Sequence, residues 1–417
     1  MTYLENFMQH HDVLIAGSGI VGATLALSLL KAGMRVGLIE TLPITAPSQN
    51  HEKMTIDAID LRVFALTRAS ERIFRHLSIW DNMVAAGISP FRQMHVWDAG
   101  GQGEIHFDCS DITEPTLGYI VEQRVIQTGL LAALQHYNSL LTWYRPAKIQ
   151  QFALTHDATA MQVQLNNNNQ LTTRLLISAE GANSSIRSAA GIPYTMHDYA
   201  QQAIVATIHT EFPHQETAWQ RFLPTGPLAF LPLANHHYCS IVWSVDTPIA
   251  QKLIALPKQE FLTQLEQAIA GQLGQIINCS ERALFPLKRG HAHHYVQSRL
   301  ALIGDAAHSV HPLAGQGVNL GLLDVASLSE VVIKAHRLGK DFGHIHILKR
   351  HERWRKTNTL TVMTAMDGFK YLFGNQQPAL SWLRNQGLIV TNALPLVKKT
   401  LMRHAMGLSG DLPPMAK

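Results

Sequence analysis

The chain has 417 residues, of which 46% are hydrophobic and 15% are charged. This composition excludes a disordered chain, and the length predicts a globular protein of two domains with a large core. The net charge is only +4 and no run of five basic residues occurs, so nucleic acid is not expected as a partner. The cysteines, Cys109, Cys239 and Cys279, form no CxxC pair, which fits a reducing compartment and buried thiols.

The first forty residues predict a βαβ unit. Residues 12–16 and 35–40 are β-rich, residues 23–32 are helical, and Gly33 ends the helix. The stretch 13–30 is uncharged, but glycines interrupt it and no Lys or Arg precedes it. We therefore predict neither a transmembrane helix nor a signal peptide, and we expect a cytoplasmic protein.

A G-x-G-x-x-G motif stands between the first strand and the helix and consists of Gly17, Gly19 and Gly22. The first glycine allows a tight turn, the second lets the backbone approach a pyrophosphate, and the third lets the helix pack on the sheet. The helix start, with Ile20 and Val21, would direct free N–H groups at the phosphates. Glu40 ends the second strand, where a carboxylate binds an adenosine ribose. These residues predict a dinucleotide site but do not separate NAD from FAD.

The rest of the chain is predicted to be β-rich in its middle and helical at its end. Helices are expected over 68–86, 125–137, 318–336 and 345–410, the last broken at Pro378 and Pro395. Strands are expected over 91–108, 162–165, 171–179, 203–209 and 239–245, with 166–169 as a polar hairpin turn.

A second glycine-rich signature, residues 304–321, separates the two cofactors. Here the chain resembles the class A flavoprotein monooxygenases of the para-hydroxybenzoate hydroxylase type. The resemblance implies FAD, with Asp305 on the ribityl chain and a loop beside the flavin ring that contains Pro312, Gly315, Gln316 and Gly317. The helix that begins near Gly317 would stabilise the reduced flavin through its dipole, with Val318 and Asn319 as further contacts. His308 and His311 are interpreted as structural.

Three further segments resemble cofactor-binding parts of the same family. Residues 180–187 match a motif that usually begins with Asp-Gly and ends with Arg; Gly181 and Arg187 are present, but Glu180 replaces the Asp. Arg62 lies in a segment that places an Arg beside the flavin. Gln123 opens a helix whose polar residue reaches the FAD phosphates, with Arg124 as the alternative.

Within class A, several stretches are similar to the ubiquinone-biosynthesis hydroxylases. Residues 304–321, 117–122 and 228–233 carry this resemblance, and residues 205–210, 239–244 and 403–408 are most similar to the 2-polyprenylphenol (2-octaprenylphenol) hydroxylase branch. Residues 219–222 are more similar to a sister branch that hydroxylates a later, methoxylated intermediate.

The implied fold is α/β, with a Rossmann-like FAD-binding domain, an inserted β-sheet substrate domain and a C-terminal helical region. The FAD-binding domain would take residues 1–190 and 291–345, the substrate domain 191–290 with a contribution from 88–110, and the helical region 346–417.

The implied reaction is hydroxylation of the aromatic ring of a polyprenylated phenol in ubiquinone biosynthesis. NAD(P)H would act as transient reductant and O2 as oxidant, through a C4a-hydroperoxyflavin. No general base is named; it is expected among residues 191–290. No metal site is predicted, since the histidines at 236–237 and 291–294 lack a familiar ligand spacing. A flavin-dependent dehydrogenase or reductase on the same fold, and an FAD-stabilised scaffold without activity, remain alternatives.

The C-terminal segment 378–417 alternates apolar and basic residues. It is a candidate surface for contact with the inner membrane or with the other enzymes of a ubiquinone-biosynthesis complex. Packing on the protein's own core is the alternative. We also expect a homo-oligomer.

Overall fold

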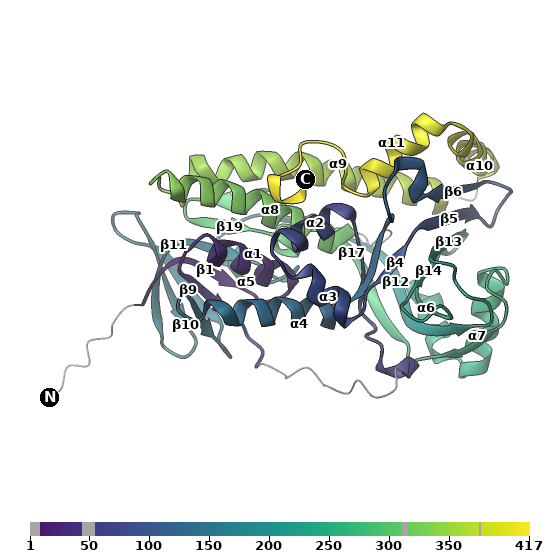
Figure 1. The fold of residues 1–417 in the computed structure, drawn as a ribbon, viewed down its shortest axis with the longest axis horizontal. Helices are drawn as coiled ribbons and strands as arrows, with labels where there is room; N and C mark the ends of the chain where they lie inside the picture. Colours follow the sequence, from purple (N-terminus) through teal and green to yellow (C-terminus); the bar gives the residue numbers. More distant parts are fainter. Residues whose placement is uncertain (1–8, 44–54, 311–315, 375–376) are drawn as a thin grey trace.

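The computed structural model describes residues 9–43, 55–310, 316–374 and 377–417. A mostly parallel sheet and a larger, mostly antiparallel sheet lie at opposite ends of the long axis, and the C-terminal helices run along one side of both (Figure 1). This architecture agrees with the predicted α/β fold.

The first sheet has the strand order β18-β19-β11-β1-β2-β8. These strands are β18 (Val296–Gln297), β19 (Leu300–Leu302), β11 (Gln170–Ser178), β1 (Gln9–Ala16), β2 (Val36–Ile39) and β8 (Leu141–Tyr144), and β19 to β8 run parallel. Helices α1 (Ile20–Lys31), α4 (Gln123–Leu134) and α8 (Gln316–Arg337) pack together on the sheet. The strands β9 (Ile149–Leu154) and β10 (Met161–Leu165) form a hairpin, and β10 pairs antiparallel with β11. The predicted βαβ unit and the hairpin turn at 166–169 are confirmed.

The second sheet has the order β20-β17-β12-β15-β14-β13-β5-β6, with β16 beside β12. Its strands are β20 (His308–Ser309), β17 (Ala283–Ala292), β12 (Tyr194–Thr210), β15 (Tyr238–Asp246), β14 (Gly226–Pro232), β13 (Thr217–Leu223), β5 (Gln93–Asp98), β6 (Glu104–Asp108) and β16 (Ile276–Cys279). One face packs on α6 (Thr247–Ala255) and α7 (Lys258–Ala268) through buried side chains such as Phe230, Trp243 and Phe261. β20 belongs to this sheet although it lies in the stretch predicted for the FAD-binding domain, so the domain boundaries stay predictions.

A small sheet, β3-β7-β4, joins the two larger ones. It consists of β3 (Val63–Leu66), β7 (Gly118–Glu122) and β4 (Ser89–Phe91), and Ile120 packs against Leu233 next to β14. The helix predicted over 68–86 is two helices, α2 (Arg68–His76) and α3 (Trp80–Ala86). The chain turns between them because Ser78 adopts a left-handed conformation, with φ of 62°.

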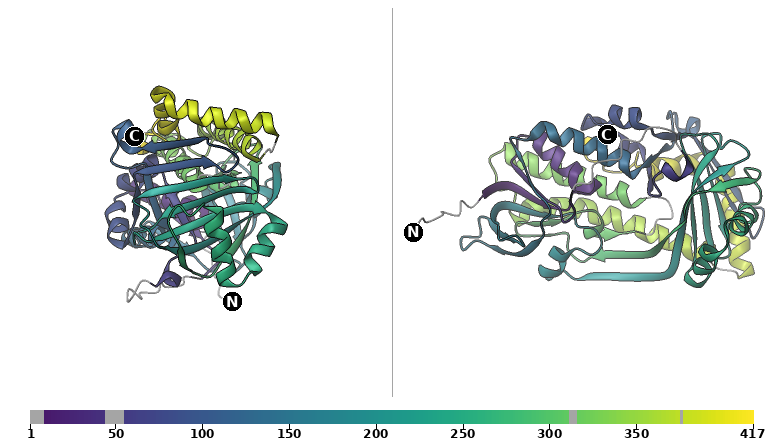
Figure 2. Two further views of the ribbon diagram at one scale, coloured as in Figure 1. Left: turned by 90° about the vertical axis from the view of Figure 1, so that its right-hand side faces the viewer. Right: turned by 90° about the horizontal axis from the view of Figure 1, so that it is seen from below.

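The C-terminal region is helical, and its breaks fall at the two predicted prolines. It forms α9 (Ile345–Gly374), α10 (Pro378–Ala393) and α11 (Pro395–Ala405). α9 packs along α8, whereas α10 packs on β6 at the edge of the second sheet (Figure 2). No helix in the described ranges is both long and apolar enough to cross a membrane. The three cysteines are free and buried.

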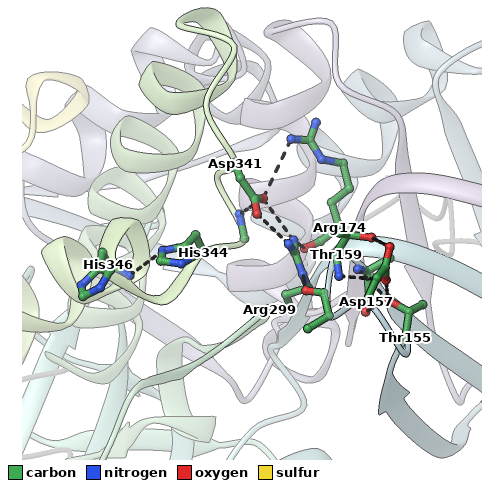
Figure 3. Close-up of polar contacts among 11 residues, drawn as sticks. Thr155, Asp157, Thr159, Arg174, Arg299, Asp341, His344 and His346 are labelled. Carbon is green, nitrogen blue, oxygen red and sulfur yellow. Dashed lines mark hydrogen bonds and ion pairs between the residues drawn. The ribbon is translucent and has the colours of Figure 1, made fainter.

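Arg299 lies between β18 and β19 of the first sheet, and its side chain binds three other segments of the chain (Figure 3). Its guanidinium donates to the carbonyl oxygens of Ala158 at 2.6 Å and Arg174 at 3.1 Å, and pairs with Asp341 at 2.6 Å. These partners belong to the β9–β10 turn, to β11 and to the loop after α8. The side chain therefore holds the hairpin and the α8–α9 connection to the sheet.

Candidate functional site

Four parallel strands of the first sheet end at one edge, and the predicted binding residues follow them directly. Gly17 follows β1, Glu40 follows β2, Gly181 lies just after β11, and Asp305 lies just after β19. Because these strands are neighbours in the order β19-β11-β1-β2, the sheet brings the four residues together. Ligands of open α/β sheets bind outside the carboxyl ends of such strands.

The three glycines of the first motif have different surroundings. Gly17 has a φ of +100°, and a Cβ there would lie 2.5 Å from the carbonyl oxygen of Ala179. A Cβ on Gly22 would lie 1.9 Å from the carbonyl oxygen of Gly17, whereas a Cβ on Gly19 would meet nothing within 4 Å. Gly17 and Gly22 are thus required for packing, and Gly19 faces open space. Gly19 also caps α1, whose first turn has no side-chain cap, so a phosphate fits there.

Val21 joins the two glycine-rich signatures, which are far apart in the sequence. A Cβ on Gly321 would lie 2.7 Å from a methyl carbon of Val21, and a Cβ on Gly304 would lie 3.3 Å from one. The start of α1, the end of β19 and the start of α8 therefore pack against one another. Ile20, the first residue of α1, is buried in the core.

Glu40 is held as a carboxylate at the end of β2. It accepts hydrogen bonds from the Ser18 backbone N–H at 2.9 Å, the Ser18 hydroxyl at 2.8 Å and the Leu42 N–H at 3.0 Å. Partial burial opposes ionisation, but these hydrogen bonds outweigh it and hold the pKa of Glu40 below its usual value. An ionised acceptor beside the glycine turn suits the hydroxyl groups of a ribose.

Asp305, Arg62 and Gln123 gather between the sheets. The side chain of Asp305 is exposed, yet surrounding protein desolvates it and raises its pKa, while the positive charge of Arg62 acts in the opposite direction. The Arg62 guanidinium lies 5.5 Å from the ring centre of Phe285, on β17 of the second sheet. The backbone N–H of Gln123 donates to the Arg62 carbonyl at 2.9 Å. Arg124 instead pairs with Glu122 at 2.8 Å.

The start of α8 is fixed by a buried amide. Asn319 Oδ1 accepts from the Thr67 N–H at 3.0 Å and from the Ser70 hydroxyl at 2.6 Å, and its Nδ2 donates to the Ala65 carbonyl. This side chain ties α8 to β3 and α2, and its contact with a cofactor stays a prediction. Gln316, Gly317 and Val318 form the first turn of α8. Pro312, Gly315 and His311 lie outside the described residues.

Glu180, which replaces the usual Asp of the third motif, binds the start of helix α5 (Ser185–Ala189), whose N-cap is Ser184. Its carboxylate accepts from the Ile186 N–H at 3.1 Å and from the hydroxyls of Ser184 and Ser185. Gly181 has a φ of +82° and open space around it. Arg187 donates to the carbonyl of Ala306 at 3.0 Å, so the third motif is bonded to the segment that carries Asp305.

Asp324 on α8 organises a buried ionic network that the sequence analysis missed. Its carboxylate accepts from the Gly304 N–H at 3.0 Å, from His308 Nε2 at 2.6 Å and from Arg355 Nε at 2.8 Å. Complete burial opposes ionisation, but His308 and Arg355 outweigh it and hold the pKa of Asp324 far below its usual range. His308 is therefore structural, as interpreted. The sequence held one signal for this network: Asp324 is the single acidic residue in the mostly apolar stretch 320–328.

The second sheet faces this site with an apolar wall. Ala203, Val205 and Leu287 form a buried cluster with Val242 and Phe285 packed against it. Tyr199 packs on the same cluster and donates its hydroxyl to Asp367 of α9 at 2.7 Å; burial raises the pKa of the phenol. This polar pair joins residues 168 apart, so no local pattern could predict it.

Comparison with known proteins agrees with this geometry. The FAD binding domain family matches residues 10–340. The 3-demethoxyubiquinol 3-hydroxylase of Escherichia coli (strain K12) is 33% identical over 96% of this chain and 99% of that protein. The mitochondrial ubiquinone biosynthesis monooxygenase COQ6 of Danio rerio is 34% identical over 94% of this chain and 89% of that protein.

A solved structure shows the same fold at lower identity. The p-nitrophenol 4-monooxygenase PnpA from Pseudomonas putida DLL-E4 superposes with a TM-score of 0.77, at 17% identity, over 97% of this chain and 99% of that one. The family match and the open, phosphate-compatible turn at Gly19 identify FAD as the cofactor. The chain is an FAD-dependent class A monooxygenase and belongs to the family of ubiquinone-biosynthesis hydroxylases.

Proposed function

We propose that the protein hydroxylates the aromatic ring of a polyprenylated phenol in ubiquinone biosynthesis, using NAD(P)H and O2. The observation that carries this proposal is the apolar wall of β12, β15 and β17, which meets the predicted cofactor-binding residues where Phe285 lies beside Arg62. An apolar wall with few polar groups suits an aromatic ring that bears a hydrocarbon chain. The names of the relatives support a substrate of this class.

Each set of residues has a part in this reaction. Bound FAD supplies the activation of oxygen. The turn at Gly19 and the first turn of α1 would bind the pyrophosphate, Glu40 the ribose, and Asp305 the ribityl chain. Arg62 and Gln123 would hold the cofactor from the side of the small sheet. The wall around Val242 and Phe285 would orient the phenol and exclude water from the reacting atoms.

Two ring positions are candidates, and different observations favour each. The stretches 205–210, 239–244 and 403–408 favour the first hydroxylation, on a polyprenylphenol. Residues 219–222 and the name of the Escherichia coli relative favour a later, demethoxylated or methoxylated intermediate. We propose the first hydroxylation, because more of the chain resembles that branch.

The quinone profile of the host tests this assignment. With the gene disrupted and the cells grown in air, mass spectrometry should show less ubiquinone and an accumulated polyprenylphenol that lacks the first added oxygen. Accumulation of a methoxylated intermediate would assign the later step. An unchanged profile would move the substrate outside the pathway.

Turnover of the purified enzyme separates a monooxygenase from a reductase. A short-chain prenylphenol should stimulate NAD(P)H oxidation and yield the hydroxylated product. Anaerobic turnover at the full rate would contradict oxygen insertion. A bound flavin that NAD(P)H cannot reduce in the presence of candidate phenols would favour a scaffold.

We further propose that the enzyme acts in the cytoplasm at the inner membrane, as a homo-oligomer within a biosynthetic complex.

A further inference from the structure

The last two long helices carry an unusual share of the exposed apolar side chains. In the described part of the chain, most of the large hydrophobic side chains that are exposed lie between residues 360 and 401. On α10, α11 and their junction they are Trp382, Leu383, Ile389, Val390, Leu394, Leu396, Val397 and Leu401, and we call this set the C-terminal apolar surface. Leu396 is 82% exposed and Trp382 is 64% exposed. Figure 1 shows these helices above β5 and β6, at the end of the molecule opposite to β9–β11.

Helix α10 attaches to the second sheet through Leu388, which packs against Val96 and Ile105, and through polar side chains. Arg384 Nε donates to the buried carboxylate of Asp98 at 2.6 Å. Asn385 donates to the same carboxylate at 2.8 Å and accepts from the Gly103 N–H at 2.6 Å. The opposite face carries Trp382, Leu383, Ile389 and Val390 and has no charged residue, since Arg384 is the only charged residue of α10. Packing within the chain therefore leaves this apolar face uncovered, which is typical of a surface that binds something else.

The charged residues of the C-terminal helices beyond Asp367 are all basic, and two of them are paired with acids of neighbouring elements: Arg384 with Asp98 and Lys398 with Asp111. No acidic residue occurs between Asp367 and Asp411. Lys399 and Arg403 are exposed on α11, at helical spacings of three and seven residues after the exposed Leu396. Basic residues next to exposed leucines and a tryptophan attract an anionic surface with an apolar interior.

We propose that the C-terminal apolar surface docks on a bilayer that contains anionic phospholipids. α10 and α11 would lie in the interface plane, with Trp382 and Leu396 among the acyl chains and with Lys399 and Arg403 at the lipid phosphates. This inference rests on the proposed function, because a polyprenylated phenol partitions into the bilayer. Docking there would bring the second sheet, on which α10 packs, next to the membrane that holds the substrate.

A second copy of the chain fits this surface less well than a bilayer. In a two-fold symmetric contact the same patch faces itself. Lys399 and Arg403, which form no ion pair within the described part of the chain, would then meet the same two cations of the partner copy, and like charges would oppose each other. An anionic bilayer supplies the missing counter-charge.

Vesicle co-sedimentation of the full-length, FAD-loaded enzyme tests the proposal. The enzyme should bind vesicles of phosphatidylglycerol and phosphatidylcholine more tightly than vesicles of phosphatidylcholine alone. Lys399→Gln with Arg403→Gln should weaken binding to the anionic vesicles roughly twenty-five-fold, because each basic residue near such a membrane contributes a factor of about five. Leu396→Gln with Leu401→Gln should weaken it by about tenfold or more, through lost apolar burial.

Exposed apolar residues elsewhere provide the matched control. Leu338 and Ile277 are 60% and 52% exposed, and the double variant Leu338→Gln, Ile277→Gln should bind as the wild type does. Equal binding of all variants, or no binding of the wild type, would overturn the proposal. Light scattering that shows a wild-type dimer, lost in the Leu396→Gln, Leu401→Gln variant, would assign the surface to a second copy instead. The assay needs no substrate, so hydroxylation of a detergent-dispersed prenylphenol tests the proposed function separately.

Discussion

Replacing Asp324 by Asn should weaken both the fold and the cofactor site. The substitution removes the charge but nearly keeps the volume of a fully buried side chain. Arg355, whose side chain is only 2% exposed, would lose its charged partner at 2.8 Å. Removing one partner of a buried ion pair costs about 3–5 kcal/mol, because the remaining charge stays desolvated.

The effect should extend to FAD through Gly304. Its N–H donates to the same carboxylate, and Asp305 is the next residue. A hydrogen bond to a neutral amide is weaker than one to a carboxylate by about 1–1.5 kcal/mol. If this loss is transmitted fully to the bound cofactor, the Kd for FAD should rise roughly tenfold. Urea-induced unfolding of the FAD-loaded enzyme, followed by flavin release, measures the first effect, and titration of the apoenzyme with FAD measures the second.

Two variants control this experiment. Asp198→Asn removes an exposed carboxylate that pairs with Lys288 at 3.0 Å, and it should leave the free energy of unfolding almost unchanged because solvent screens this pair. Asp324→Asn combined with Arg355→Gln removes the unpaired cation and should recover most of the lost stability. A loss below about 1 kcal/mol for Asp324→Asn alone, or a double variant that is additively worse, would refute the argument that the buried charge pair is coupled.

Three further changes should have separable effects. Gly22→Ala should prevent native packing because its Cβ would meet the Gly17 carbonyl, whereas Gly19→Leu should fold but lose FAD; circular dichroism and flavin content distinguish the two. Burial lowers the pKa of His351 to about 4, so between pH 6.5 and about 4 the unfolded chain binds a proton at this residue that the folded chain does not. The free energy of unfolding should therefore fall as the pH falls through this range. Urea titrations at successive pH values should show a weaker pH dependence for His351→Gln. Arg299→Lys should cost about 1–3 kcal/mol, because an ammonium group cannot satisfy three divergent acceptors, and a calorimetric scan should show it without a change in FAD affinity.

The frame of the cofactor site could be predicted because short stretches of sequence build it. The turn at Gly17, the start of α1 and the strand that ends at Glu40 depend on residues within one βαβ unit. The hairpin around 166–169 and the helix breaks at Pro378 and Pro395 are local in the same way. Such features follow from backbone conformation and turn chemistry, which a single sequence shows.

Contacts between distant segments could not be predicted in this way. The pairing of Arg384 with Asp98 spans 286 residues, and that of Tyr199 with Asp367 spans 168. The break at Ser78 was missed because the helical spacing continues through it. The sequence showed only that Glu180 replaces an Asp; its hydrogen bond from the Ile186 N–H at the start of α5 became visible in the structure.

This difference bears on how the family distinguishes its substrates. The predicted FAD site consists of main-chain turns and carboxylates at strand ends, so two branches that act on different ring positions could share it. We expect the groups that select a ring position to lie instead on β12, β15 and β17, where Val242 packs in the same apolar cluster as Phe285, the neighbour of Arg62. Substitution of Val242 should therefore change which prenylphenol is hydroxylated and leave FAD affinity unchanged. A parallel loss of FAD would mean that the wall also supports the cofactor, and selectivity would have to be sought elsewhere.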